Sequence, residues 1–222
     1  MAYEQASVIE QGNSLGDVLA RNKCLRQTYM LLAVNLLFSA ICAFAGMALK
    51  VGPINPIIHL VAFIGLSLLV AKNANNGFGI VFLFAFTGFL GFALSSLLSM
   101  YIAAGAGDVV VKALVGTAVL FGSLSVYAIV SGKSFSFLGG FLFCGVIVAL
   151  LAGIANLFLH MPVLSVAISA AVLLIFSGYV LYDTSNIVNN GERNYIIATL
   201  QLFLDIYNIF VALLNILMAL RD

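Results

Sequence analysis

Long apolar stretches run along nearly the whole chain, and short polar clusters separate them. Most are about 20 residues long, which is the length that a helix needs to cross a bilayer at roughly 1.5 Å per residue. A transmembrane barrel would show short segments of alternating hydrophobicity instead. We therefore predict an all-α membrane protein with seven transmembrane helices, at residues 27–49, 56–71, 78–104, 109–130, 137–159, 163–189 and 195–220.

The first 25 residues differ from the rest, because they are polar, carry charges of both signs and lack a hydrophobic period. They are too long and too acidic for the charged region of a signal peptide, and the apolar run after them is too long for its core. We expect residues 1–25 to be an uncleaved flexible cytoplasmic tail and residues 26–222 to form the membrane domain.

The ends of the last two spans carry capping signals. Asn194 is a predicted N-cap of the seventh span, and Gly191 suits a left-handed residue after the sixth. Glycines scattered through the spans predict close helix packing, since small residues let helices in lipid approach one another. The glycines in question are Gly88, Gly91, Gly139, Gly140, Gly145 and Gly153.

Composition supports the membrane class and narrows the chemistry. Hydrophobic residues make up 64% of the chain and charged residues 8%, against roughly 45–50% and 25% in an ordinary soluble domain. A net charge of +1 gives no reason to expect nucleic-acid binding. The three cysteines are isolated and the two histidines are far apart, so we expect no metal site and no cofactor.

Basic residues indicate the orientation. With the N-terminus in the cytoplasm, six basic residues are cytoplasmic and three lie on the other side. Seven spans then place the C-terminus in the periplasm. The cytoplasmic group is Arg21, Lys23, Arg26, Lys72, Lys133 and Arg193, and the opposite group is Lys50, Lys112 and Arg221.

Polar residues in the last span lie on one helical face. Gln201, Asp205, Asn208 and Asn215 follow steps of four, three and seven. Unsatisfied polar groups in lipid cost several kcal/mol, so this face must turn toward protein or water. The last helix is therefore expected to lie centrally within the other six.

The sixth span repeats the pattern near its end, at Tyr179, Asp183, Asn186 and Asn190. A short polar turn at 189–193 makes the two helices antiparallel neighbours. Counted at 1.5 Å per residue, Asp183 lies about 9–12 Å from the turn and Asp205 about 16–21 Å. Helix tilt and side-chain reach reduce this mismatch only in part.

Two aspartates within membrane spans call for an explanation, since a carboxylate costs about 2.5–3.5 kcal/mol at a helix centre. If Asp183 and Asp205 touch, both can ionise only at a high free-energy cost, so the pair shares a proton. With one shared proton, the carboxyl pair joins the two helices. With no proton, the two carboxylates repel each other or bind a cation. In the alternative interpretation, asparagines satisfy each aspartate separately and the pair only holds the helices in register.

Several stretches of sequence resemble the Bax-inhibitor family of seven-span membrane proteins, over nearly the whole chain. Within it, the likeness is to the bacterial branch that modulates the membrane protease FtsH. These stretches are Phe-Ala-Phe-Thr-Gly-Phe-Leu-Gly at 84–91, Ser-Phe-Ser-Phe-Leu-Gly-Gly at 134–140, Asp-Thr-Ser-Asn-Ile at 183–187, Gly-Glu-Arg-Asn-Tyr-Ile at 191–196 and Leu-Asp-Ile-Tyr-Asn-Ile-Phe at 204–210.

The resemblance implies a last helix surrounded by the other six, in a bacterial inner membrane. It also implies an FtsH complex as partner, and Asp183 and Asp205 match the aspartate dyad of pH-sensitive calcium leak channels. An arginine near the end of the second span approaches the dyad in those relatives, and here Lys72 stands about one position further on. The residues expected to line a calcium path or to latch it are Lys72, Gln201, Asn208 and Asn186.

Three functions follow from this sequence, of which the first two are compatible. One is a pH-gated calcium leak, and another is a non-enzymatic modulator of FtsH. The third is an intramembrane aspartyl protease, which also uses two carboxylates that share a proton. That enzyme requires Gly-x-Gly-Asp before its second aspartate, whereas residues 202–205 read Leu-Phe-Leu-Asp. We therefore expect no enzyme activity.

Overall fold

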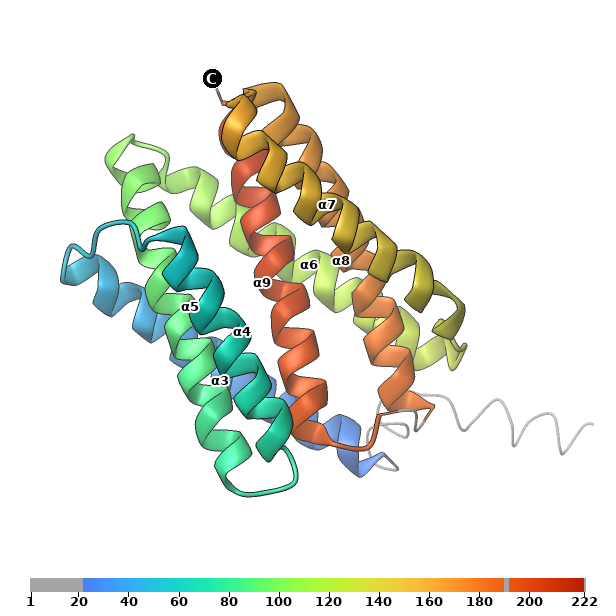
Figure 1. The fold of residues 1–222 in the computed structure, drawn as a ribbon. Coiled ribbons are helices and arrows are strands. Elements are labelled where there is room, and N and C mark those ends of the chain that lie inside the picture. Colours follow the sequence, from blue (N-terminus) through green and yellow to red (C-terminus); the bar gives the residue numbers. More distant parts are fainter. Residues whose placement is uncertain (1–21, 190–191, 222) are drawn as a thin grey trace, which may run out of the picture. The chain divides into compact units, whose positions relative to one another are not determined.

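The computed structural model describes residues 22–189 and 192–221, and long helices account for most of them. All seven long helices are long and apolar enough to cross a membrane, which confirms the predicted all-α fold with seven spans. In chain order they are α3 (Lys23–Ala48), α4 (Pro56–Asn73), α5 (Phe78–Ala103), α6 (Gly107–Ser131), α7 (Gly139–Leu159), α8 (Pro162–Val188) and α9 (Tyr195–Ala219) (Figure 1).

The helix ends differ from the predicted spans by a few residues. α3 begins at Lys23 rather than Gln27, so it includes the last part of the predicted tail. The reason is a cap: the side-chain oxygen of Asn22 accepts a hydrogen bond from the backbone N–H of Leu25 at 3.0 Å. The rest of the predicted tail, residues 1–21, lies outside the described residues, as does the predicted role of Gly191.

Capping also explains where α9 begins. The side-chain oxygen of Asn194 accepts hydrogen bonds from the backbone N–H groups of Ile196 at 2.9 Å and Ile197 at 3.3 Å. This confirms the predicted N-cap. The fifth predicted span starts with a short 3-10 turn, η1 (Ser136–Leu138), before α7.

The chain divides into two compact units. The first comprises the described residues of Met1–Arg26, Ala113–Arg193 and Asp205–Asp222, and the second comprises Gln27–Lys112 and Asn194–Leu204. α9 therefore contributes residues to both units. Together with α5 it has the largest buried share of the described spans, 39%.

In the second unit, α3 and α5 meet through small residues. A Cβ added at Gly91 would overlap the backbone carbonyl of Ser39, so the two backbones nearly touch there. One turn away, the hydroxyl of Thr87 donates to the side-chain oxygen of Asn35 at 2.9 Å, and both residues are fully buried. This bond satisfies two polar groups and fixes the register of the helices.

In the first unit, α7 lies alongside α8 (Figure 1). Here too glycines leave room for large neighbouring side chains. An added Cβ would meet the ring of Tyr182 at Gly139 and the side chain of Ile175 at Gly145. The predicted packing role is wrong for two other glycines of α7, where an added Cβ has nothing within 4 Å: Gly140 and Gly153.

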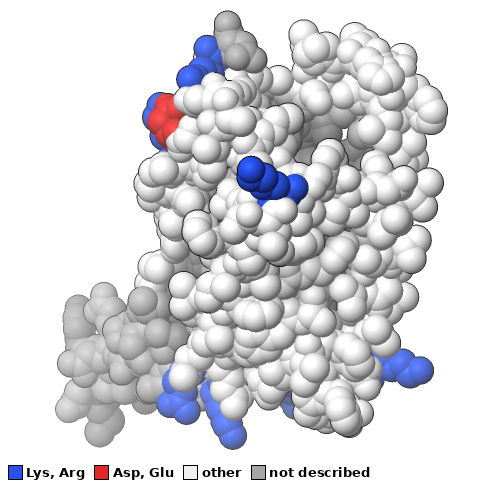
Figure 2. Space-filling model, turned by 90° about the vertical axis from the view of Figure 1, so that its left-hand side faces the viewer, with Lys and Arg blue, Asp and Glu red and all other residues white. Residues whose placement is uncertain are grey.

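Large apolar side chains on the outward faces remain exposed, as a bilayer requires. In the most apolar 18-residue stretch of α4, only 6% is buried inside the protein. Most of the face drawn in Figure 2 is uncharged, and its Lys and Arg side chains lie mainly near the upper and lower ends. The exposed surface is thus apolar where the spans face lipid.

The close approach of α3 and α5 predicts that Gly91→Ala destabilises the protein. The added methyl group overlaps backbone that cannot move independently, so we expect a loss of about 1–3 kcal/mol, measured as a lower Tm in detergent. Gly65→Ala in α4 is the matched control, because an added Cβ there meets nothing within 4 Å. An equal Tm for the two variants would contradict the proposed contact.

Candidate functional site

Asp183 on α8 and Asp205 on α9 belong to the same compact unit, and both are almost completely buried. Their exposed fractions are 4% and 2%. The two side chains are hydrogen-bonded to one another. Ionised carboxylates only accept hydrogen bonds, so this contact requires a proton on one of them. The structure therefore places the two aspartate side chains next to one another.

One carboxyl oxygen of the pair, Oδ2 of Asp205, is buried and has no hydrogen-bond partner among the described residues. A buried polar atom without a partner costs about 1–3 kcal/mol, which is unusual enough to indicate a role. Such an oxygen can take up a proton or coordinate a cation. No group of three or more His, Cys, Asp and Glu side chains suited to a metal ion occurs in the described part of the chain.

The depth mismatch estimated from the sequence does not keep the aspartates apart. That estimate assumed that both helices leave the turn at one level. In the structure α8 ends at Val188 and α9 starts at Tyr195, and the described residues between them are not helical. Helical rise therefore does not fix the relative depth of the two carboxyl groups.

The segment of α8 around Asp183 is held by hydroxyl contacts. Thr184 lies 3.5 Å from Ser125 of α6, oxygen to oxygen, and Ser185 accepts a hydrogen bond from the backbone N–H of Phe135 at 3.2 Å. Thr184 and Ser185 are fully buried. These contacts fix the rotation of α8 and so orient Asp183 toward α9.

Two other titratable side chains lie near the pair. Tyr179, one turn before Asp183 on α8, interacts with both aspartates, and Glu192 interacts with Asp183. Glu192 is held close to the end of α8, because its backbone N–H donates to the carbonyl of Asn186 at 3.1 Å. Glu192 thus adds a third carboxylate near the dyad.

The other predicted site residues lie in different places. Asn186 and Asn208 are half-buried, about one turn from Asp183 and Asp205 on the same helices and in the same unit. Gln201 is half-buried in the second unit, and Lys72 is exposed in the last turn of α4, also in the second unit. The role of these four residues in a path or latch stays a prediction.

Sequence reasoning missed Asn22. Its side-chain nitrogen donates to the carbonyl of Ile187 at 2.8 Å and is 3.4 Å from that of Val188, so it satisfies the end of α8. The thiol of Cys24 also contacts the carbonyl of Glu192, at 3.8 Å. Asparagine before an apolar helix signals a cap for its own helix, but nothing in the sequence indicates a partner 165 residues away.

Comparison with known proteins shows the family. A family model described as "Inhibitor of apoptosis-promoting Bax1" matches residues 21–222, which include all seven helices and both aspartates. The chain belongs to the Bax inhibitor family. The resemblance deduced from its sequence motifs is thereby confirmed.

Individual Bax inhibitor relatives cover almost the whole chain. "Modulator of FtsH protease YccA" of Escherichia coli K12 is 46% identical over 210 residues, 95% of this chain and 96% of the relative. "Inner membrane protein YccA" of E. coli O6:H1 gives the same values. An "Uncharacterized membrane protein" of Vibrio cholerae is 42% identical over 207 residues, 92% of this chain and 93% of the relative. None of these three names describes an enzyme.

The contact between the aspartates predicts strong coupling in a double-mutant cycle. Asp183→Ala and Asp205→Ala each leave one buried carboxyl group without its partner, whereas the double variant removes both. We expect a coupling free energy of about 1.5–3 kcal/mol, from unfolding in detergent. The exposed pair Asp108–Lys112 is the control, with an expected coupling of about 0.3–0.5 kcal/mol. Additive effects at the dyad would exclude the contact.

Proposed function

We propose that this Bax inhibitor family member is a non-enzymatic modulator of an FtsH-type protease in a bacterial inner membrane. The observation that carries the proposal is 46% identity over 95% of the chain to a relative named for that activity. The alignment covers 96% of that relative. The same relationship favours an inner-membrane location.

The proposed point of engagement is the polar N-terminal segment, residues 1–21, on the cytoplasmic side. Its cytoplasmic placement rests on the excess of basic residues on that side of the predicted topology. A polar terminus outside the membrane is the kind of segment that a processive protease can grasp. Asn22, which follows this segment in the sequence, donates a hydrogen bond to the backbone carbonyl of Ile187 at the end of α8.

Deletion of residues 2–21 tests this proposal. In a bacterium that contains FtsH, we expect the tagged full chain to co-purify with the protease and the deletion variant to lose that association and to have a longer cellular lifetime. A variant with residues 2–21 scrambled but unchanged in composition controls for the mere presence of a tail. If the full chain does not co-purify and the deletion leaves its lifetime unchanged, the proposal fails.

A second function is favoured by a separate observation, the buried dyad with its unpartnered oxygen. We propose a proton-gated leak for calcium in which Asp183 and Asp205 form the gate. Oxygen ligands suit calcium, and two carboxylates are too few for tight binding, so the ion passes without being held. Asn186, Asn208 and Gln201 are the proposed polar lining, with Lys72 as an electrostatic partner.

The gating step is a change in the number of protons on the dyad. One shared proton joins α8 to α9, whereas two ionised carboxylates repel each other or take up a cation between them. Tyr179 and Glu192 lie close enough to influence this change electrostatically. The leak is therefore expected to depend on pH through the dyad and its neighbours.

Calcium flux into liposomes that contain the purified protein tests the leak. We expect wild-type flux to differ between mildly acidic and mildly alkaline buffer. Asp183→Asn and Asp205→Asn should each lose the pH dependence, since an amide keeps a hydrogen bond to the remaining carboxyl but cannot titrate. Asp108→Asn, in an exposed ion pair with Lys112, is the matched control and should behave as wild type. An unchanged pH profile in Asp205→Asn, or no flux at any pH, would exclude the proposed gate.

A further inference from the structure

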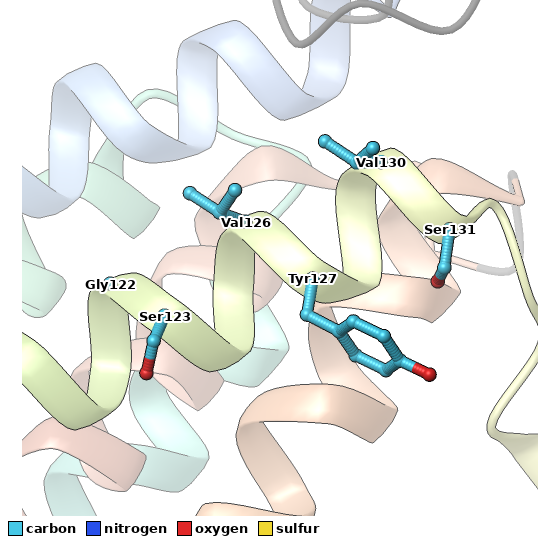
Figure 3. Close-up of a pocket in the computed structure, with 6 residues that line it drawn as sticks. All are labelled: Gly122, Ser123, Val126, Tyr127, Val130 and Ser131. Atoms are coloured by element: carbon cyan, nitrogen blue, oxygen red, sulfur yellow. The ribbon is translucent and has the colours of Figure 1, made fainter.

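One face of α6 carries an open apolar groove with a volume of about 660 Å³ (Figure 3). Its walls are almost wholly carbon, although three of its residues carry a hydroxyl group. The residues that line it are Gly122, Ser123, Val126, Tyr127, Val130 and Ser131. Val126, Tyr127 and Val130 are each about half exposed, and α6 spans the membrane, so the groove opens to lipid.

Aromatic rings mark the end of this groove. The ring centre of Tyr127 lies 6.1 Å from that of Phe135, which in turn lies 6.5 Å from that of Phe137. Tyr127 points away from the helix and presents its hydroxyl outward (Figure 3). Amphipathic rings at the end of a span are typical of the boundary between the hydrocarbon and the headgroups. The groove therefore runs from the headgroup level into the apolar layer.

The loop beyond α6 places a cation and hydroxyl groups at that level. Lys133 is exposed and its backbone N–H contacts the hydroxyl of Ser131, a groove residue, at 3.5 Å. Ser134 and Ser136 are exposed and hydrogen-bonded to each other at 3.0 Å. Residues 131–138 contain no acidic side chain, so this loop favours a negatively charged ligand.

The loop is held in place by α8 rather than by the ligand. The backbone N–H of Phe135 donates to the buried hydroxyl of Ser185 at 3.2 Å, and the side chain of Asn189 is 3.5 Å from the carbonyl of Lys133. A preformed loop loses less conformational freedom on binding than a free one does. The lysine, the serine hydroxyl groups and the groove therefore lie at the same end of α6.

We propose that this surface is a binding site for an anionic phospholipid. One acyl chain lies in the groove of α6 along Val126 and Val130, and the headgroup phosphate lies at Lys133, Ser134 and Ser136. A lysine beside hydroxyl donors at the membrane surface suits a lipid phosphate, and residues 131–138 carry no acidic side chain that would repel it.

Native mass spectrometry of the detergent-purified full chain tests the site, with phosphatidylglycerol and phosphatidylcholine of the same acyl chains as probes. We expect phosphatidylglycerol to bind more tightly. Lys133→Gln should lower its affinity roughly fivefold and leave phosphatidylcholine unchanged, as one lysine near an anionic group contributes about 1 kcal/mol. Gly122→Leu should weaken both lipids, since its side chain fills the groove without meeting protein within 4 Å of the Cβ.

Matched controls lie at the other end of α6 and on α7. Lys112→Gln removes a cation that is already paired with Asp108, and Gly153→Leu adds a side chain at a glycine with equally open space. Both control variants should bind the two lipids as wild type does.

The proposal is overturned if Lys133→Gln behaves like Lys112→Gln. It is also overturned if Gly122→Leu keeps full lipid binding, which would indicate a surface charge contact without a groove. Binding of inorganic phosphate that competes with the lipid in wild type, but not in Lys133→Gln, would support the headgroup position.

Discussion

A hydrogen bond between two buried carboxyl groups, those of Asp183 and Asp205, joins α8 to α9 within the first unit. Burial disfavours the ionised form of each aspartate, and two neighbouring carboxyl groups can both ionise only at a high free-energy cost. Buried hydroxyls at Thr184 and Ser185 fix the orientation of α8. Oδ2 of Asp205 has no hydrogen-bond partner among the described residues, and a buried polar atom without a partner lowers stability by about 1–3 kcal/mol.

Packing elsewhere follows the rules of a lipid solvent. Apolar side chains gain little from leaving lipid for protein, so close backbone approach and buried hydrogen bonds provide the specificity. The contact of Gly91 with Ser39 and the bond of Thr87 to Asn35 do this for α3 and α5. The same logic explains why the outward faces of the helices are apolar and lack precise packing.

The end of α8 is where several parts of the first unit meet. Asn22, which follows the N-terminal segment, donates to the carbonyl of Ile187, and Asn189 contacts the carbonyl of Lys133 in the loop after α6. Ile187 lies one turn from Asp183. The end of α8 therefore connects Asn22 and the loop after α6 with the helix that carries Asp183.

The sequence by itself determined the class, the number of spans, the cap at Asn194, the family and the identity of the two aspartates. These depend on local composition, on helical periodicity and on short sequence motifs, none of which needs tertiary information. Only the tertiary structure decided that the carboxyl groups touch, because the depth of each depends on the non-helical linker and on helix packing. It also decided that Gly91 is packed while Gly153 is open, and that Asn22 caps a helix far along the chain. Contacts between distant residues leave no periodic signal, so these features could not be read from the chain alone.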